Sequence, residues 1–130
     1  MSDSTVLIDL YLSFKRSAVF AALDEEVLLS FLQLGRKIDY PGGSMILKKG
    51  SDIRHVYAFL KGEPVVLKGN WNRPVFWGLE ALVAPQTNPS DLVALPEGTQ
   101  ALVFSVPQLI AFLNEAPDVL ISLIKQTTKT

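Results

Sequence analysis

Few side chains in this sequence could carry bond-making chemistry. His55 is the single histidine among 130 residues, and the chain has no cysteine. Zinc sites draw on several histidine, cysteine or carboxylate ligands, so one histidine cannot supply a metal centre of that kind. The chain has no thiol, and no serine and acid are arranged around the histidine, so the sequence shows no set of residues for nucleophilic catalysis. We therefore expect no enzyme, no metal and no cofactor, and we interpret His55 as a surface residue of a strand.

Three adjacent acids, Asp24, Glu25 and Glu26, could act as paired acids in catalysis. Helix capping explains them better, because aspartate is a good N-cap and acids in a first turn complement the helix dipole. The apolar run that follows them ends at Leu34, and Gly35 is a plausible C′ residue. The pattern predicts a helix that ends at Leu34.

Composition and charge exclude several classes of partner. Hydrophobic residues make up 48% of the chain and charged residues 19%, so a single domain with a real core is expected. The net charge of -1 leaves no basic excess, which argues against a nucleic-acid surface. No apolar run approaches the roughly 20 residues that span a bilayer, and the acidic N-terminus does not resemble a signal peptide. We expect a cytoplasmic protein with neither nucleic-acid nor membrane partners.

Residues 40–62 alternate between turn signals and short apolar segments. Pro41-Gly42-Gly43 predicts a turn, because proline presets φ and glycine accepts positive φ. A short strand is predicted over Ser44–Leu47 and a second turn over Lys49–Asp52. Ile53–Leu60 is rich in β-branched and aromatic residues, which favours another strand. Tight turns between short strands are typical of an antiparallel sandwich or barrel.

The remaining sequence predicts helices at both ends and strands between them. An apolar stripe from Val6 to Phe14 predicts an N-terminal helix that covers the sheet or, alternatively, contacts a partner. Further strands are predicted over residues 36–40, 64–67, 73–77, 91–95 and 100–104. Turns are predicted at 69–70 and 96–98, a helical turn at 78–83 and a loop at 84–90. Two C-terminal helices are predicted to begin near Ser105 and Pro117. Segregated helices and strands predict an α+β fold, with an antiparallel β jelly-roll or double-stranded β-helix sandwich flanked by N- and C-terminal helices. The predicted single domain, 1–130, comprises a helical lead-in 5–35, a β-roll 36–104 and C-terminal helices 105–127.

The pattern of the central stretch resembles that of a known family. The matching residues are Tyr40-Pro41-Gly42-Gly43, Ile46, Lys49-Gly50-Ser51-Asp52 and Val56-Tyr57-Ala58-Phe59-Leu60-Lys61-Gly62. They are similar to those of the cyclic nucleotide-binding domain family, which includes the sensor domain of catabolite activator protein and the regulatory domains of cyclic-AMP-dependent kinase. The resemblance covers about Leu12 to Ile124 and implies the fold described above.

The resemblance also implies where a ligand should bind. In the family, a short helix presents its N-terminal amides to the cyclic phosphate, an arginine assists it, and a glutamate accepts from the ribose hydroxyl. The usual pattern begins roughly Phe-Gly-Glu-Leu-Ala-Leu. Here Trp77, Gly78, Ala81 and Leu82 fit, whereas Leu79 occupies the glutamate position and Glu80 follows one residue later. One residue turns a helical side chain by about 100°, so Glu80 does not simply inherit the ribose contact.

The second half of the family pattern, Pro-Arg-x-Ala-Thr, is also altered. Pro89 or Ser90 replaces the arginine, Leu92 or Val93 replaces the threonine, and Asp91 adds a negative charge. Losing the charged partner of the phosphate costs roughly 2–3 kcal/mol of binding free energy, and a like charge beside the phosphate adds to this cost. Together they should lower the affinity for a cyclic nucleotide by about a hundredfold or more. Lys68 and Arg73 could supply a substitute cation, but we interpret both as solvated surface charges.

The sequence therefore predicts a stand-alone regulatory or ligand-sensing module that does not bind cyclic AMP or cyclic GMP in the usual way. The alternatives are a protein–protein interaction module with a closed pocket and a residual cyclic-nucleotide binder. An unknown small molecule or a partner protein is expected, and homodimers are a further expectation. The candidate pocket comprises Gly78, Leu79, Glu80, Ala81, Leu82, Pro89, Ser90, Asp91, Leu92 and Val93, with residues 84–90 as a mobile lid.

Overall fold

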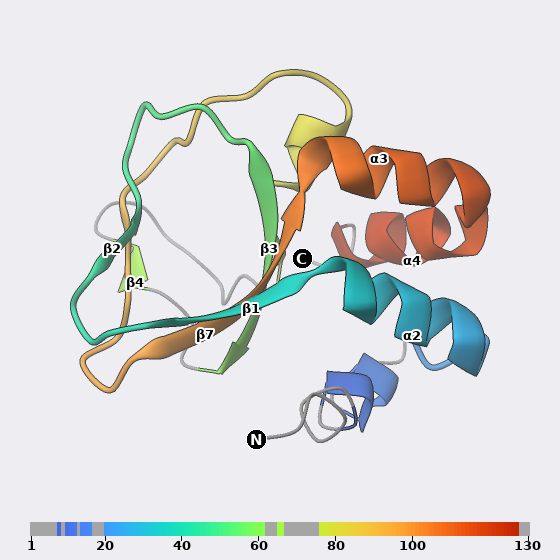
Figure 1. The fold of residues 1–130 in the computed structure, drawn as a ribbon. Helices are drawn as coiled ribbons and strands as arrows, with labels where there is room; N and C mark the ends of the chain where they lie inside the picture. Colours follow the sequence, from blue (N-terminus) through green and yellow to red (C-terminus); the bar gives the residue numbers. More distant parts are fainter. Residues whose placement is uncertain are drawn as a thin grey trace. The chain divides into compact units, whose positions relative to one another are not determined.

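The computed structural model describes residues 8, 10–12, 14–16, 20–61, 65–66 and 76–127. It divides into a helical unit, Met1–Gly35 with Pro107–Thr130, and a β-roll unit, Arg36–Val106. Several expectations fall outside the described residues: the start of the N-terminal helix, Lys68, Arg73, and the turns at Gly62 and at Gly69-Asn70. Figure 1 shows both units.

The β-roll unit consists of two antiparallel sheets. One has the strand order β1-β7-β3-β5 and the other the order β2-β6-β4. The described strands are β1 Arg36–Tyr40, β2 Met45–Leu47, β3 His55–Lys61, β4 Val65–Val66, β5 Phe76–Trp77, β6 Leu92–Val93 and β7 Thr99–Ser105. In Figure 1, β1 and β7 run side by side, in agreement with the pairing of Arg36 with Val103 and of Tyr40 with Thr99. The antiparallel sandwich expected from the sequence is confirmed.

Among the described residues, the largest differences from the expected strand bounds lie in two strands. The third strand begins at His55 instead of Ile53, because Ile53 donates its N–H to Gln86 in a neighbouring loop. The strand expected over residues 91–95 is reduced to Leu92–Val93, since Asp91 and Ala94 bond to residues outside the ladder. Both differences arise from partners that are distant in the sequence.

An aromatic and aliphatic cluster fills the interior of the roll. Tyr57 and Phe59 alternate along β3, so they project to the same face, where their rings stack at a centroid distance of 6.0 Å and an interplanar angle of 12°. The cluster comprises Tyr57, Phe59, Trp77, Leu92, Ala101 and Val103, with Ile38, Tyr40, Ile46 and Leu47 packed against it. Its members come from both sheets, and burying them stabilises the sandwich.

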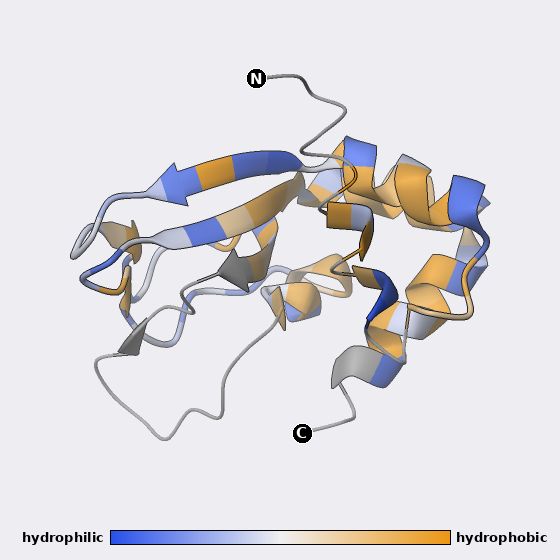
Figure 2. Cartoon of the chain, turned by 90° about the horizontal axis from the view of Figure 1, so that it is seen from below, coloured by the Kyte–Doolittle hydropathy of each residue, from blue (hydrophilic) through white to orange (hydrophobic). Residues whose placement is uncertain are grey.

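The helical unit contains α2 Glu25–Leu34, α3, which begins at Val106 and ends at Glu115, and α4 Pro117–Thr127. The described residues between 8 and 15 are also helical. Each of these helices mixes hydrophobic and hydrophilic residues, as Figure 2 shows by colour, which is typical of amphipathic helices. Phe31 lies at the centre of the unit, with ring centroids 6.1 Å from Phe14, 6.2 Å from Phe20 and 6.1 Å from Phe112.

The ends of α2 agree with the prediction in position but not in detail. Asp24 occupies the N-cap position, yet its carboxylate makes no capping hydrogen bond to the described helix. Gly35 follows the helix directly, as expected, but its φ of -83° and ψ of 162° differ from the left-handed conformation common at this position. The chain passes directly from the helix into β1, which begins at Arg36, so extended backbone is required at this glycine.

Candidate functional site

The candidate site begins with a single helical turn after β5. This turn is the 3-10 helix η1, Leu79–Leu82, and it confirms the short helix predicted here. Gly78 precedes it with φ 94° and ψ 9°, a left-handed conformation that favours glycine. A Cβ atom at this position would lie 2.8 Å from the carbonyl oxygen of His55. Glycine therefore allows the turn to approach the β3 backbone closely.

Substitution at Gly78 tests this close approach. Gly78→Ala should lower the free energy of unfolding by about 2–4 kcal/mol, because left-handed strain of about 1–2 kcal/mol is added to the clash with the His55 carbonyl. Gly50→Ala is the matched control, since Gly50 has φ +87° but no atom within 4 Å of the added Cβ. Urea denaturation of both variants measures the difference, and equal losses would contradict the steric argument.

The side chains of η1 divide into buried and exposed groups. Ala81 is buried, Leu79 and Leu82 are half-buried, and Glu80 is exposed. The residue after the turn, Val83, is 90% exposed. Leu79 thus places an aliphatic side chain at the position where the family resemblance implies a ribose-binding carboxylate, and the neighbouring carboxylate of Glu80 faces solvent.

Asn88 is the polar centre of the second half of the site. Its side chain is buried, with a relative exposure of 1% for the residue. Its Oδ1 accepts a hydrogen bond from the indole Nε1 of Trp77 at 3.0 Å. Its Nδ2 donates to the carbonyl oxygens of Lys48 (3.3 Å) and Ser90. One amide therefore joins the end of β5, the β2–β3 connection and the segment before β6.

Backbone hydrogen bonds anchor the loop that carries Asn88. Its N–H donates to the carbonyl of Ser51 at 2.8 Å, and its carbonyl accepts from Gly50 at 2.8 Å. The Ile53 N–H donates to the Gln86 carbonyl at 2.9 Å. Figure 1 shows the gold loop following the green β2–β3 connection. From Gln86 onward the loop is therefore hydrogen-bonded to the β2–β3 connection, and its role as a mobile lid stays a prediction.

The residues after Asn88 occupy different environments. Asp91 accepts a hydrogen bond on Oδ1 from the Lys49 N–H at 2.6 Å, so its carboxylate is fixed against the β2–β3 turn. Pro89 is exposed and Ser90 half-buried. Leu92 is fully buried in the core cluster, and Val93 pairs with Met45 and Val65 in the second sheet. The structure thus brings the two halves of the candidate site together through Trp77 and Asn88.

Sequence reasoning did not identify Asn88 as a site residue. The Asn-Pro dipeptide is a turn signal, and it correctly indicates irregular backbone here. The hydrogen bond to Trp77 spans 11 residues and the bond to Lys48 spans 40, so the local pattern carries no signal for either. The expectation for His55 is confirmed, since this residue lies on β3 with an exposed side chain. Among the described residues, no group of three His, Cys, Asp or Glu could hold a metal ion.

Burial inside the roll perturbs one titratable group strongly. Desolvation raises the pKa of Tyr57 to about 12 from its ordinary value of 10.0, and the nearby Tyr40 adds to the rise. A raised pKa means that the unfolded chain releases this proton first as the pH increases. The stability that depends on neutral Tyr57 is therefore complete below pH 10 and is lost as the pH rises from about 10 to about 12.

A spectrophotometric titration of tyrosinate checks this behaviour. The folded protein should show a late phase near pH 12 that disappears in Tyr57→Phe. If all three tyrosines ionise together near pH 10 while the protein stays folded, the phenol of Tyr57 is not desolvated as described.

Comparison with known proteins finds structural relatives only. No family model matches the sequence, and no curated protein matches it. The N-terminal domain of a transcriptional regulator from Streptomyces coelicolor is similar with a TM-score of 0.67 and 19% identity, over 90% of this chain and 88% of that one. The catabolite activator protein of Thermus thermophilus is similar with a TM-score of 0.72 and 20% identity, over 87% of this chain and 57% of that one.

A third similar structure is a putative cAMP-binding regulatory protein from Silicibacter pomeroyi. Its TM-score is 0.66 and its identity 12%, over 91% of this chain and 58% of that one. The chain thus corresponds to little more than half of the length of the last two proteins. At these identities the likeness establishes the fold. Within the described residues, no helix is long and apolar enough to cross a bilayer.

Proposed function

Because the chain has the fold of the cyclic nucleotide-binding domains, we propose that it is a non-enzymatic regulatory module that senses a ligand other than a conventionally bound cyclic nucleotide. One observation carries the proposal. In the segment where the family resemblance implies a phosphate-binding arginine, the chain holds Ser90 and Asp91, and the Asp91 carboxylate is fixed on the Lys49 N–H at 2.6 Å.

The electrostatics of this segment disfavour a cyclic phosphate. A carboxylate repels a phosphate, and moving Asp91 aside would break its hydrogen bond to the turn. Asn88 cannot turn toward a ligand either, because its amide is buried and bonded to Trp77 on one side and to backbone carbonyls on the other. The polar groups of this segment serve the fold of the chain itself.

The ligand that fits these residues best is a small molecule with little charge. Leu79 and Leu82 are half-buried aliphatic side chains at the two ends of η1, which favours apolar contacts. The proposed ligand-contacting residues are those expected from the sequence except Leu92, which has no exposed surface: Gly78, Leu79, Glu80, Ala81, Leu82, Pro89, Ser90, Asp91 and Val93. Ligand binding would change how the module contacts a partner protein, and that protein would carry the response.

A second candidate function is a protein–protein interaction module whose pocket is closed. The stacked rings of Tyr57 and Phe59 favour it, because they occupy the interior of the roll together with Trp77. In that case the fold is retained for its outer surface, and no small molecule enters.

Native mass spectrometry of freshly purified protein separates these functions. A retained adduct that is not a nucleotide is the result expected of the sensor. Bare protein that stays bare after incubation with cell-extract metabolites would favour the interaction module. A cyclic-nucleotide adduct would contradict both and support a residual nucleotide binder. Gel filtration of the same sample measures whether the chain forms the homodimer expected from its apolar N-terminal segment.

A further inference from the structure

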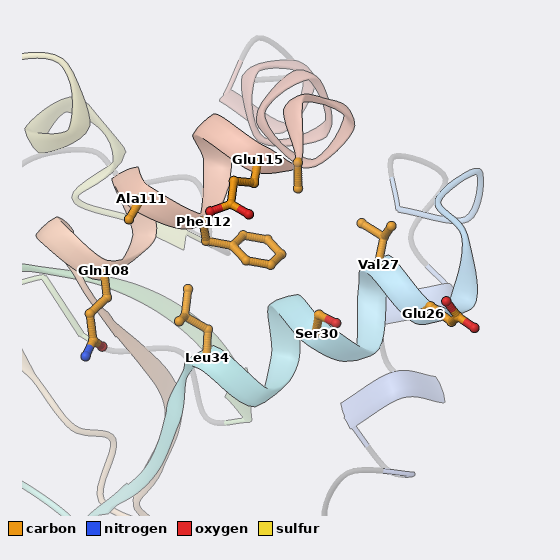
Figure 3. Close-up of a pocket in the computed structure, with 9 residues that line it drawn as sticks. Glu26, Val27, Ser30, Leu34, Gln108, Ala111, Phe112 and Glu115 are labelled. Atoms are coloured by element: carbon orange, nitrogen blue, oxygen red, sulfur yellow. The ribbon is translucent and has the colours of Figure 1, made fainter.

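A groove lies within the helical unit, between α2 and α3. Its volume is about 540 Å³, and it is lined by Glu26, Val27, Ser30, Leu34, Gln108, Ala111, Phe112, Glu115 and Ala116. Figure 3 shows Val27, Ser30 and Leu34 on α2 and Phe112 and Glu115 on α3 around the same space. All of these residues belong to the helical unit, so the groove is separate from the roll and its candidate ligand site.

The floor of the groove is apolar and firmly supported. Val27, Leu34 and Phe112 are half-buried, so each still offers part of an apolar side chain. The Phe112 ring rests against that of Phe31, which is fully buried, at a centroid distance of 6.1 Å. A floor held in this way is already formed before a ligand arrives, which reduces the entropic cost of binding.

The rim of the groove is acidic. Glu26 and Glu115 are exposed lining residues from opposite helices. Neither α2, EEVLLSFLQL, nor α3, VPQLIAFLNE, contains a lysine or an arginine. The two helices together carry three carboxylates, Glu25, Glu26 and Glu115, and no cation of their own. A cationic partner complements this field, whereas an anionic lipid surface is repelled.

The groove is long enough to hold part of a helix. The lining residues on α2 run from Glu26 to Leu34, which corresponds to about 12 Å at about 1.5 Å per residue. That length accommodates about two turns of a partner helix, with apolar anchors at i and i+4. Lysine or arginine beside these anchors would reach the carboxylates on the rim.

We propose that this groove docks a basic amphipathic helix of a partner protein, with apolar anchors on Val27, Leu34 and Phe112 and cationic side chains on Glu26 and Glu115. The inference goes beyond the proposed function of the roll and does not depend on it, because none of its residues belongs to the roll. It gives a regulatory module a surface through which a partner can be held.

The test uses fluorescence anisotropy with a labelled helical peptide of about four turns, which carries leucines at i and i+4 on one face and lysines beside them. The protein should bind it, and binding should weaken as salt increases. A peptide with glutamate in place of lysine should bind at least about tenfold more weakly. Equal binding of the two peptides, or none of either, would overturn the proposal.

Protein variants locate the binding. The double variant Glu26→Lys and Glu115→Lys should weaken binding at least about tenfold. Its matched control is Asp39→Lys with Glu97→Lys, which makes the same change in net charge at exposed positions of the roll and should leave binding unchanged. Ser30→Arg places a cation inside the groove at an exposed helical position, and it should weaken binding even where the first variant is poorly folded.

Other occupants would appear as distinct results. Self-association that the groove variants abolish would assign the groove to a second copy of this chain and overturn the proposal. Binding to anionic lipid vesicles that Glu26→Lys with Glu115→Lys strengthens would assign the groove to a membrane and also overturn the proposal. Failure of the roll to bind any small molecule leaves the peptide result unaffected, so the two proposals fail separately.

Discussion

Replacing Asn88 by leucine should lower the free energy of unfolding by about 2–4 kcal/mol, because it removes the acceptor of the buried Trp77 indole N–H and the donor to two part-buried carbonyls. Leucine has nearly the shape of asparagine but no amide. The indole N–H of Trp77 loses its acceptor, and the carbonyls of Lys48 and Ser90 lose a donor. An unsatisfied buried donor or acceptor costs about 1–3 kcal/mol, which makes this one of the largest expected effects in the roll.

Gln86→Leu is the matched control for Asn88→Leu. Gln86 lies two positions earlier in the same loop and is exposed, so removal of its amide should change stability by no more than about 0.5 kcal/mol. The denaturant concentration at the unfolding midpoint measures the stability of each variant, provided that the two have the same m-value. Similar effects for both would show that the Asn88 amide is not the anchor of this loop. A neutral result for Asn88→Leu would contradict the network itself.

Replacing Phe31 by alanine should cost about 3–5 kcal/mol, because it removes a large ring from the centre of the helical unit. Phe31 has no exposed surface, and its ring lies against those of Phe14, Phe20 and Phe112. The loss combines the transfer free energy of the ring with that of the cavity left behind. Phe112 also loses its support, so Phe31→Ala should weaken peptide docking in the groove more than its effect on folding explains.

Phe31→Leu separates packing from hydrophobicity at this position. Leucine keeps much of the apolar volume and should cost clearly less than alanine. Thermal and chemical unfolding measure both variants. A cost below about 1 kcal/mol for Phe31→Ala would mean that the aromatic cluster does not hold the helical unit together.

The features that could be predicted from the sequence are those fixed by local chemistry. The turns at Pro41-Gly42-Gly43 and Pro96-Glu97-Gly98 follow from proline and glycine, and the turn N–H groups of Ser44 and Gly98 donate to Pro41 and Leu95 as expected. The α2 helix follows from its apolar periodicity. Such signals lie within a few residues of the structure that they determine.

The features that could not be predicted depend on residues far apart in the chain. The bond between Lys49 N–H and Asp91 spans 42 residues, so Asp91 looked only like an unfavourable charge, whereas it fastens a turn. Asn88 was assigned to a polar loop because nothing near it in the sequence indicates burial. The groove between α2 and α3 requires the packing of two helices that are separated by the whole roll.

Calorimetric titration with cyclic AMP and cyclic GMP measures whether this chain binds a cyclic nucleotide. We expect no saturable binding of either nucleotide below millimolar concentration, because the phosphate would meet the Asp91 carboxylate and no arginine stands at position 89 or 90. Saturable binding of either nucleotide with a dissociation constant near 1 μM, about -8.2 kcal/mol, would contradict this expectation.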